Sequence, residues 1–268
     1  MLKRLLILTL ALLGLAGFAY AQIFDEHAYG PHPKHRLDVY VPKGAEGAPV
    51  ILMLHGGGWQ TGSKRVPNVW FNKSRHYTSQ GYVFVSTNTR LMPEAHPLEQ
   101  VQDLARALAY VEENAHKWGG DPERIILMGH SSGAHVATLL ALRQDLLQAA
   151  GVRAPMAVVS LDTAALDVAQ GMSGVARRWL GPVFGEDQTQ WQAASPVTYI
   201  DAEDPPLLIV CSSTRSWPCP MAERFAQPFS QVDVLPAPLA HRAINGRLGR
   251  KGRYTDAVDA WLDRVQLP

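Results

Sequence analysis

The chain has 268 residues, of which 47% are hydrophobic and 18% are charged, and its formal net charge at pH 7 is +1. These proportions are typical of a globular protein with a sizeable core, and the length fits one compact domain. The near-neutral charge and the scattered lysines and arginines exclude the basic surface that nucleic-acid binding requires.

The first residues differ from the rest of the chain. Lys3 and Arg4 precede an apolar run over residues 5–19, and a small-residue A-x-A pattern ends at Ala21. This order predicts a secretory signal peptide over residues 1–21, with an uncleaved membrane anchor as the alternative. Cleavage would leave 25 − 2 = 23 basic groups against 24 acidic ones. We therefore expect a periplasmic or secreted protein without stable membrane insertion after cleavage.

Strands and helices are predicted to alternate through the remaining domain, residues 22–268. The clearest helical pattern covers residues 98–118, with apolar side chains at helical spacing. Short apolar runs, several of them continuous enough to be buried on both faces, predict strands at 37–41, 50–54, 82–88, 125–128, 156–161, 207–211 and 232–235. The alternation predicts an α/β fold with a mainly parallel sheet, helices on both faces and a site beyond the carboxyl ends of the strands.

Three histidines near the start of this domain could be mistaken for a metal site. His27, His32 and His35 lie in a proline-containing stretch that is typical of a loop, and no pair of carboxylates adjoins them. Solvated or locally hydrogen-bonded histidines are therefore the favoured interpretation, and we expect neither a metal ion nor an organic cofactor.

A glycine run follows the strand predicted at 50–54. The sequence His55-Gly56-Gly57-Gly58-Trp59 leaves successive backbone N–H groups uncovered by side chains. Such groups can closely approach a developing oxyanion. The backbone of Gly57 and Gly58 is therefore a candidate half of an oxyanion hole.

A second glycine-flanked motif follows the strand predicted at 125–128. Gly129-His130-Ser131-Ser132-Gly133 has the G-x-S-x-G pattern and precedes a helical pattern. Between a strand and a helix this pattern is typical of the nucleophile elbow, where a strained turn raises the serine hydroxyl above the sheet edge. Ser131 is the candidate nucleophile, and the N–H of Ser132 is the remaining candidate oxyanion donor.

Together these two motifs resemble the α/β-hydrolase esterases that carry an HGGGW loop, close to the hormone-sensitive-lipase, feruloyl-esterase and kynurenine-formamidase-like branches. The resemblance runs from about Tyr29 to the C-terminal helix and includes Leu37-Asp38-Val39-Tyr40-Val41-Pro42, the run from Gly119 to Ile125, and Ala194-Ser195-Pro196. It implies a Ser-His-acid hydrolase, and it is much more specific for the fold than for the substrate.

The acid is where this sequence departs from that family. Many members place an aspartate after the next-to-last strand, but the corresponding loop here, residues 211–218, contains no carboxylate. Asp162 instead follows the preceding strand and keeps the chain order Ser, Asp, His, as in some lipases of the fold. Asp162 is therefore the candidate acid and Asp167 the next choice; the competing interpretation is that Asp162 only caps a turn. Asp204 and Asp233 are placed before and within strands.

The segment between Asp162 and the strand at 207–211 is predicted to form a small cap over the site, about residues 163–200. We expect its aromatic residues to pack within the protein rather than to contact substrate; they are Trp179, Phe184, Trp191 and Tyr199. A small cap favours an ester with a modest acyl group, or an aromatic ester, over one with a long lipid chain.

The two cysteines lie close together, at the end of a predicted strand and the start of a predicted helix. In an exported protein the pair Cys211 and Cys219 predicts a disulfide, with two free thiols as the alternative.

The general base is expected late in the chain, because in this fold the histidine follows the serine and the acid. His241 is the last histidine and lies in a predicted loop directly after the strand at 232–235. It resembles the family's H-x-x-I-N segment, here His241-Arg242-Ala243-Ile244-Asn245. We expect His55 to shape the oxyanion loop, and His130 and His135 to flank the elbow without the right approach.

These candidates predict an exported serine carboxylesterase acting on a small-molecule ester, with Ser131, His241 and Asp162 as the triad. Two alternatives remain open. One is an amide-cleaving hydrolase of the same fold, formamidase- or peptidase-like. The other is a non-catalytic binding protein on a hydrolase scaffold, which the missing carboxylate in the loop 211–218 suggests.

Overall fold

The computed structural model describes residues 25–174 and 176–266. Its centre is an eight-stranded sheet in the order β1-β2-β4-β3-β5-β6-β7-β8. The strands β3 to β8 pair in parallel, while β1 and β2 form an antiparallel edge, β2 against β4. The strands are β1 (Asp25–Ala28), β2 (Arg36–Tyr40), β3 (Ala48–Leu54), β4 (Val83–Thr87), β5 (Gly120–His130), β6 (Ala157–Leu161), β7 (Leu207–Ser212) and β8 (Val232–Ala237).

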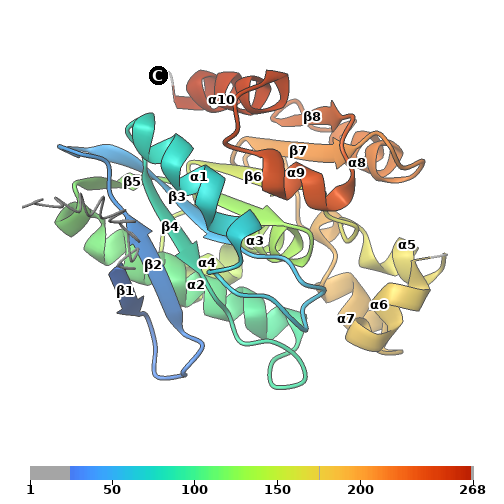
Figure 1. Cartoon of the computed structure of the whole chain (residues 1–268). Coiled ribbons are helices and arrows are strands. Elements are labelled where there is room, and N and C mark those ends of the chain that lie inside the picture. Colours follow the sequence, from blue (N-terminus) through green and yellow to red (C-terminus); the bar gives the residue numbers. More distant parts are fainter. Residues whose placement is uncertain (1–24, 175, 267–268) are drawn as a thin grey trace, which may run out of the picture.

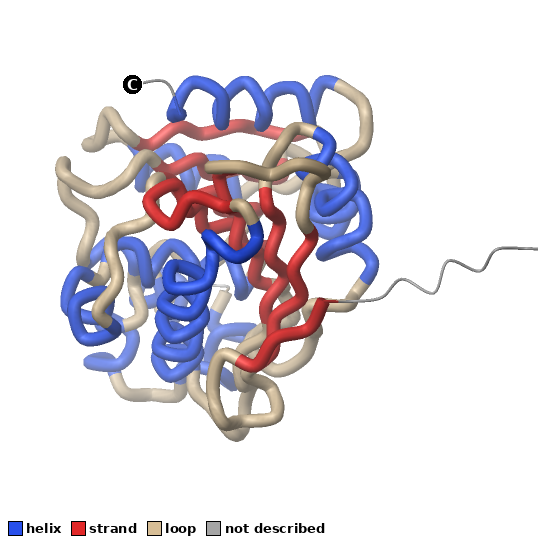
Figure 2. Tube along the Cα trace, turned by 90° about the vertical axis from the view of Figure 1, so that its left-hand side faces the viewer, coloured by secondary structure: helices blue, strands red, loops and turns tan. Residues whose placement is uncertain are grey.

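Helices cover both faces of this sheet, as Figures 1 and 2 show. The α-helices are α1 (Pro67–Ser79), α2 (Pro97–Asn114), α3 (Ser132–Leu142), α4 (Gln144–Ala150), α5 (Val168–Met172), α6 (Arg177–Phe184), α7 (Gln188–Ala193), α8 (Pro218–Ala226), α9 (His241–Arg247) and α10 (Arg253–Gln266). Short 3-10 helices cover Ala115–Trp118 and Pro196–Thr198.

The two faces of the sheet carry separate hydrophobic cores. Along β3, Val50, Leu52 and Leu54 pack on the face covered by α2, α3, α4 and α8, while Ile51 and Met53 pack on the face covered by α1, α9 and α10. Successive side chains of a strand point to opposite faces, so a strand buried on both faces needs an unbroken apolar run. This is why the short apolar runs predicted the central strands.

The predicted strands are all present, with their ends shifted. The largest difference is β5, which begins at Gly120 rather than residue 125 because Gly120 also pairs with Ala48 of β3. The predicted helix 98–118 ends its α-helical part at Asn114 and finishes as a 3-10 turn closed by Gly119 in the left-handed region. The prediction missed β1, which is exposed and polar and therefore has no apolar pattern.

The signal peptide predicted at residues 1–21 lies outside the described residues. Within residues 25–174 and 176–266, no helix is both long and apolar enough to cross a membrane.

Candidate active site

Three predicted side chains form one hydrogen-bonded row at the carboxyl edge of the sheet. Ser131 lies between β5 and α3, Asp162 directly follows β6, and His241 begins α9. The Ser131 hydroxyl lies 3.0 Å from His241 Nε2, and His241 Nδ1 lies 2.7 Å from Asp162 Oδ2. The sequence predicted His241 in a loop, but it is the first residue of α9. The loop between β8 and α9 covers only residues 238–240. The arrangement lets His241 accept the serine proton while Asp162 holds the opposite ring nitrogen.

The elbow has a backbone that its flanking glycines make possible. Ser131 has φ 56°, a left-handed value that non-glycine residues rarely adopt. A side chain at Gly129 would lie 2.3 Å from the Gly133 carbonyl oxygen, and one at Gly133 would lie 2.3 Å from the His55 carbonyl oxygen. The turn can therefore close only with glycine at both positions, which places the serine above the sheet edge.

The glycine loop after β3 lies directly against the elbow. A side chain at Gly56 would meet the His130 carbonyl oxygen at 2.7 Å, and one at Gly57 would meet the Thr61 carbonyl oxygen at 1.9 Å. Gly58 and Ser132 line the same cavity as Ser131. Ser132 is the first residue of α3, so its N–H lies outside the intrahelical ladder. These positions suit the oxyanion role expected of Gly57, Gly58 and Ser132.

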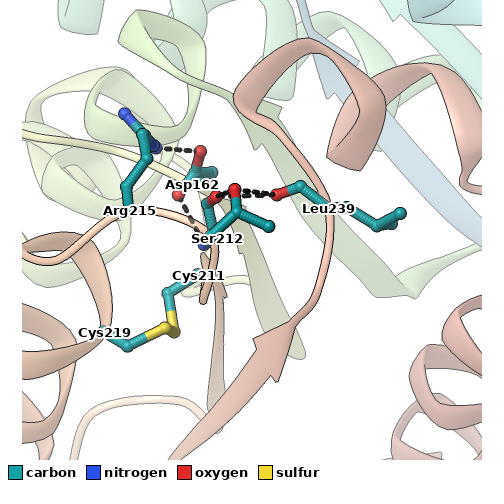
Figure 3. The surroundings of a disulfide bond; sticks show 7 residues. Asp162, Cys211, Ser212, Arg215, Cys219 and Leu239 are labelled. Carbon is teal, nitrogen blue, oxygen red and sulfur yellow. Dashed lines mark hydrogen bonds and ion pairs between the residues drawn. A yellow bond between two sulfur atoms is a disulfide. The ribbon is translucent and has the colours of Figure 1, made fainter.

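Asp162 is the better placed of the two candidate acids. Its side chain is fully buried and accepts hydrogen bonds from the backbone N–H of Ser212 and from Arg215 (Figure 3). It also accepts one from His241 Nδ1. Asp167 instead caps α5 by accepting from the N–H of Gln170 at 2.8 Å. The capping use that was the alternative for Asp162 therefore applies to Asp167. Burial alone would raise the Asp162 pKa, but the donors from His241, Ser212 and Arg215 outweigh it and hold the pKa below its ordinary value.

Arg215 is a site residue that the sequence prediction missed. It lies in the loop after β7, where the family's aspartate was expected, and its guanidinium pairs with Asp162. Its Nη2 is also 3.5 Å from His241 Nδ1. The absence of a carboxylate in this loop was the available signal: an arginine there can contact an acid supplied by the neighbouring strand.

The remaining histidines around the elbow are buried and neutral. Burial, together with the nearby His241, lowers the pKa of His130 to about 3, and burial lowers the pKa of His55 and of His135 to about 4. His130 donates through Nε2 to the His241 carbonyl oxygen at 3.0 Å. His135 accepts from the Trp59 indole at 3.1 Å and donates to the Ala194 carbonyl oxygen at 2.7 Å. None of them approaches Ser131 as His241 does, so they hold the loops around it.

The three histidines near the N-terminus each contact a different carboxylate. His27 lies 3.0 Å from Asp25, His32 lies 2.8 Å from Glu94, and His35 lies 3.1 Å from Asp103. These separate contacts agree with locally bonded histidines.

A buried lysine anchors the helix that begins with His241. Lys73 on α1 donates to the Asn68 carbonyl and to both the backbone and side-chain oxygens of Asn245 on α9, each at 2.7 Å. Burial lowers the pKa of Lys73 to about 7. An unfolded lysine titrates near pH 10.4, so between about pH 7 and 10 the unfolded chain binds more protons than the folded chain.

The free energy of unfolding should therefore rise with pH across this window. We expect the parent to gain roughly 3–4 kcal/mol relative to Lys73→Met between pH 7 and pH 10. Urea denaturation at several pH values measures this difference, with each variant compared to itself at pH 7. Parallel pH curves for the parent and Lys73→Met would contradict the assignment.

A cavity of about 540 Å³ opens at Ser131 and His241. Its wall includes Leu180 and Pro182 of α6, from the segment predicted as a cap, and Trp217 of the loop after β7. An adjoining cavity of about 390 Å³ shares Gly58, Ser131 and His241 with it and includes Gly57. Ser131 is thus reached from two sides, so a molecule bound at its hydroxyl could extend into both cavities.

The predicted disulfide is present. Cys211 in β7 is bonded to Cys219 in α8, and Figure 3 shows the bond beside the Asp162 cluster. The closed loop carries Arg215 and Trp217. Both cysteines are buried.

Removing this bond should destabilise the protein. For a sequence separation of 8, loop closure corresponds to about 2–3 kcal/mol. We expect the double variant Cys211→Ala/Cys219→Ala to lose roughly that free energy of unfolding in guanidinium denaturation. Parent protein reduced with a phosphine should shift in the same direction, and unreduced parent should show no maleimide-reactive thiol. A loss below about 0.5 kcal/mol, or two reactive thiols before reduction, would contradict this.

Comparison with known proteins places the chain in a family. Residues 37–216 match the family described as BD-FAE. The chain belongs to this family. It is 30% identical to esterase LipQ of Mycobacterium tuberculosis over 206 residues, which is 71% of this chain and 48% of that protein. It is 32% identical to the probable isoprenylcysteine alpha-carbonyl methylesterase ICMEL2 of Arabidopsis thaliana, over 50% of this chain and 31% of that protein. The chain therefore spans less than half the length of these two curated relatives.

Solved structures are similar to this family member over most of its length. The apo form of Thermogutta terrifontis esterase 2 matches with a TM-score of 0.74 and 20% identity, covering 90% of this chain and 94% of that one. The predicted α/β-hydrolase fold is therefore confirmed.

Proposed function

We propose that the protein is an exported serine carboxylesterase that cleaves esters of small or aromatic substrates through a Ser-His-Asp acyl-enzyme mechanism. The observation that carries the proposal is the row Ser131, His241, Asp162, with contacts of 3.0 and 2.7 Å, opening onto a cavity of about 540 Å³. The names of the relatives, an esterase and a probable methylesterase, agree with ester chemistry.

The acylation step follows from these contacts. The Ser131 oxygen attacks the ester carbonyl carbon while its proton passes to His241 Nε2, and Asp162 stabilises the imidazolium. The carbonyl oxygen becomes an oxyanion that the N–H groups of Gly57, Gly58 and Ser132 would bind. The imidazolium then returns its proton to the alkoxide leaving group as the carbon–oxygen bond breaks. This leaves the acyl group on Ser131 and releases the alcohol.

Deacylation repeats the sequence with water. His241 accepts a proton from a water molecule that attacks the acyl carbon. The same N–H groups would bind the second oxyanion. The Ser131–acyl bond then breaks, the Ser131 oxygen regains a proton from His241, and the carboxylic acid leaves. Both half-reactions use only these side chains, the backbone N–H groups and water.

A fluorophosphonate probe and a substrate panel test this proposal. A catalytic serine should react covalently with the probe, whereas a non-catalytic binding protein would stay unlabelled. Short-chain p-nitrophenyl esters should be hydrolysed with a kcat/KM at least about 100-fold above that for the matching p-nitroanilides. Preferred cleavage of the anilides would replace the proposal with the amide-cleaving alternative.

Export rests on the charged and apolar order of residues 1–21 and on the disulfide, because disulfides persist in oxidising compartments. Expressed with its full N-terminus in a bacterial host, the protein should be recovered outside the cytoplasm beginning at Gln22. Intact-mass measurement of the periplasmic and membrane fractions checks this. A protein that keeps Met1 in the membrane fraction would instead support the uncleaved anchor.

A further inference from the structure

Four planar side chains, which we call the stack, contact one another in series on the wall of the cavity of about 540 Å³. The Arg178 guanidinium lies 4.3 Å from the centre of the Trp179 ring, and the Arg215 guanidinium lies 4.9 Å from the centre of the Trp217 ring. The two indoles lie 6.2 Å apart at an angle of 31°. All four residues line the cavity that contains Ser131 and His241. The stack thus joins α6 to the loop after β7.

The charge of this wall is unbalanced. Asp162 is the one carboxylate among the described residues lining the cavity, and its fully buried side chain is occupied by His241, Ser212 and Arg215. Two arginines against one aspartate leave a net charge of 2 − 1 = +1 on the cavity wall.

Arg178 is the cation that is free to bind. Across residues 25–174 and 176–266 it makes no ion pair, whereas the adjacent Arg177 does not line the cavity and pairs with Glu186. Stacking on Trp179 uses the face of the guanidinium. The N–H donors lie in its plane and remain able to form a bidentate pair with a carboxylate.

We propose that this cavity selects esters in which one arm ends in a carboxylate. Arg178 is the main residue that binds this carboxylate, and Arg215 is a second cation beside it. The inference rests on the proposed esterase function and specifies its substrate class. Leu180, Pro182 and Trp59 on the same wall would contact the apolar part of that arm. The competing role for the stack is purely structural, holding α6 against the loop after β7.

Matched ester pairs that differ in one charge test the proposal. For the acyl arm the pair is p-nitrophenyl hydrogen adipate and p-nitrophenyl methyl adipate; for the alcohol arm it is 4-carboxyphenyl acetate and 4-carbamoylphenyl acetate. Each kcat/KM is divided by the rate of hydroxide hydrolysis of the same ester. We expect the anionic member of one pair to be preferred about tenfold, and the preference to shrink as NaCl is raised from 50 to 500 mM.

The variant Arg178→Gln should lower this preference to about threefold or less, and Arg178→Lys should keep part of it, because lysine retains the charge without the planar fork. Arg177→Gln is the matched control: it removes the same charge one residue away, outside the cavity, and should leave the ratio unchanged. A structural role for Arg178 would alter both esters of a pair equally. No anionic preference in either pair, or equal loss in the two glutamine variants, would overturn the inference.

Binding separates this inference from the esterase proposal. If neutral esters are hydrolysed without an anionic preference, only the inference fails. If no ester is hydrolysed, the proposed function fails, and calorimetric titration with adipate monomethyl ester against dimethyl adipate decides the inference alone. Tighter binding of the anion by the parent, and about tenfold weaker binding of it by Arg178→Gln, would support the subsite; equal affinities would overturn it.

Discussion

Replacing Ser131 with alanine should lower kcat for a short-chain p-nitrophenyl ester by roughly four to six orders of magnitude. The hydroxyl that attacks the substrate is then gone, and only binding and the oxyanion N–H groups remain. Alanine meets the same backbone strain as serine at φ 56°, so the turn itself should be kept. Steady-state assays at saturating substrate measure the loss.

Two controls make this result specific to the nucleophile. The melting temperature and circular dichroism of Ser131→Ala should match those of the parent, and the fluorophosphonate probe should label the parent but not the variant. More than about a tenth of the parental activity in a folded Ser131→Ala protein would remove Ser131 from the mechanism.

The second large effect is expected at the acid. Asp162→Asn should lower kcat by about three to four orders of magnitude near neutral pH, because an amide neither fixes the His241 tautomer nor stabilises its imidazolium. Asparagine tolerates the left-handed backbone that Asp162 adopts at φ 58°, so the local fold should survive. Steady-state kinetics with the same ester give the size of the effect.

Asp167→Asn is the matched control for this prediction. Asp167 caps α5 through the N–H of Gln170, and asparagine caps a helix about as well as aspartate. Its activity should stay within a few-fold of the parent. The reverse result would move the role to Asp167. If both variants stay within about tenfold of the parent, the site works as a Ser–His dyad and the proposed triad is wrong in its third member.

The sequence alone predicted the central strands and the two glycine-containing turns because each depends on a local pattern of residues. A strand buried on both faces must be continuously apolar, as residues 50–54 are, and a turn with a left-handed serine needs glycine on both sides. The disulfide was also predictable, because its cysteines are separated by only 8 positions and their segments were both recognisable. The polar edge strand β1 was missed because its pairing with β2 leaves no apolar signal.

The tertiary structure decided the questions that depend on residues far apart in the chain. Asp162 and Asp167 are five positions apart, and only the packing of α9 across the sheet edge brings His241, 79 positions later, within 2.7 Å of Asp162. The contact of Arg215 with Asp162 spans 53 positions. Likewise, Trp179 and Trp217 meet only because α6 packs beside the loop after β7. Local sequence determines the conformation of each strand and turn, but the side chains that meet at a sheet edge come from different loops, and their distances are set by the packing of the whole fold.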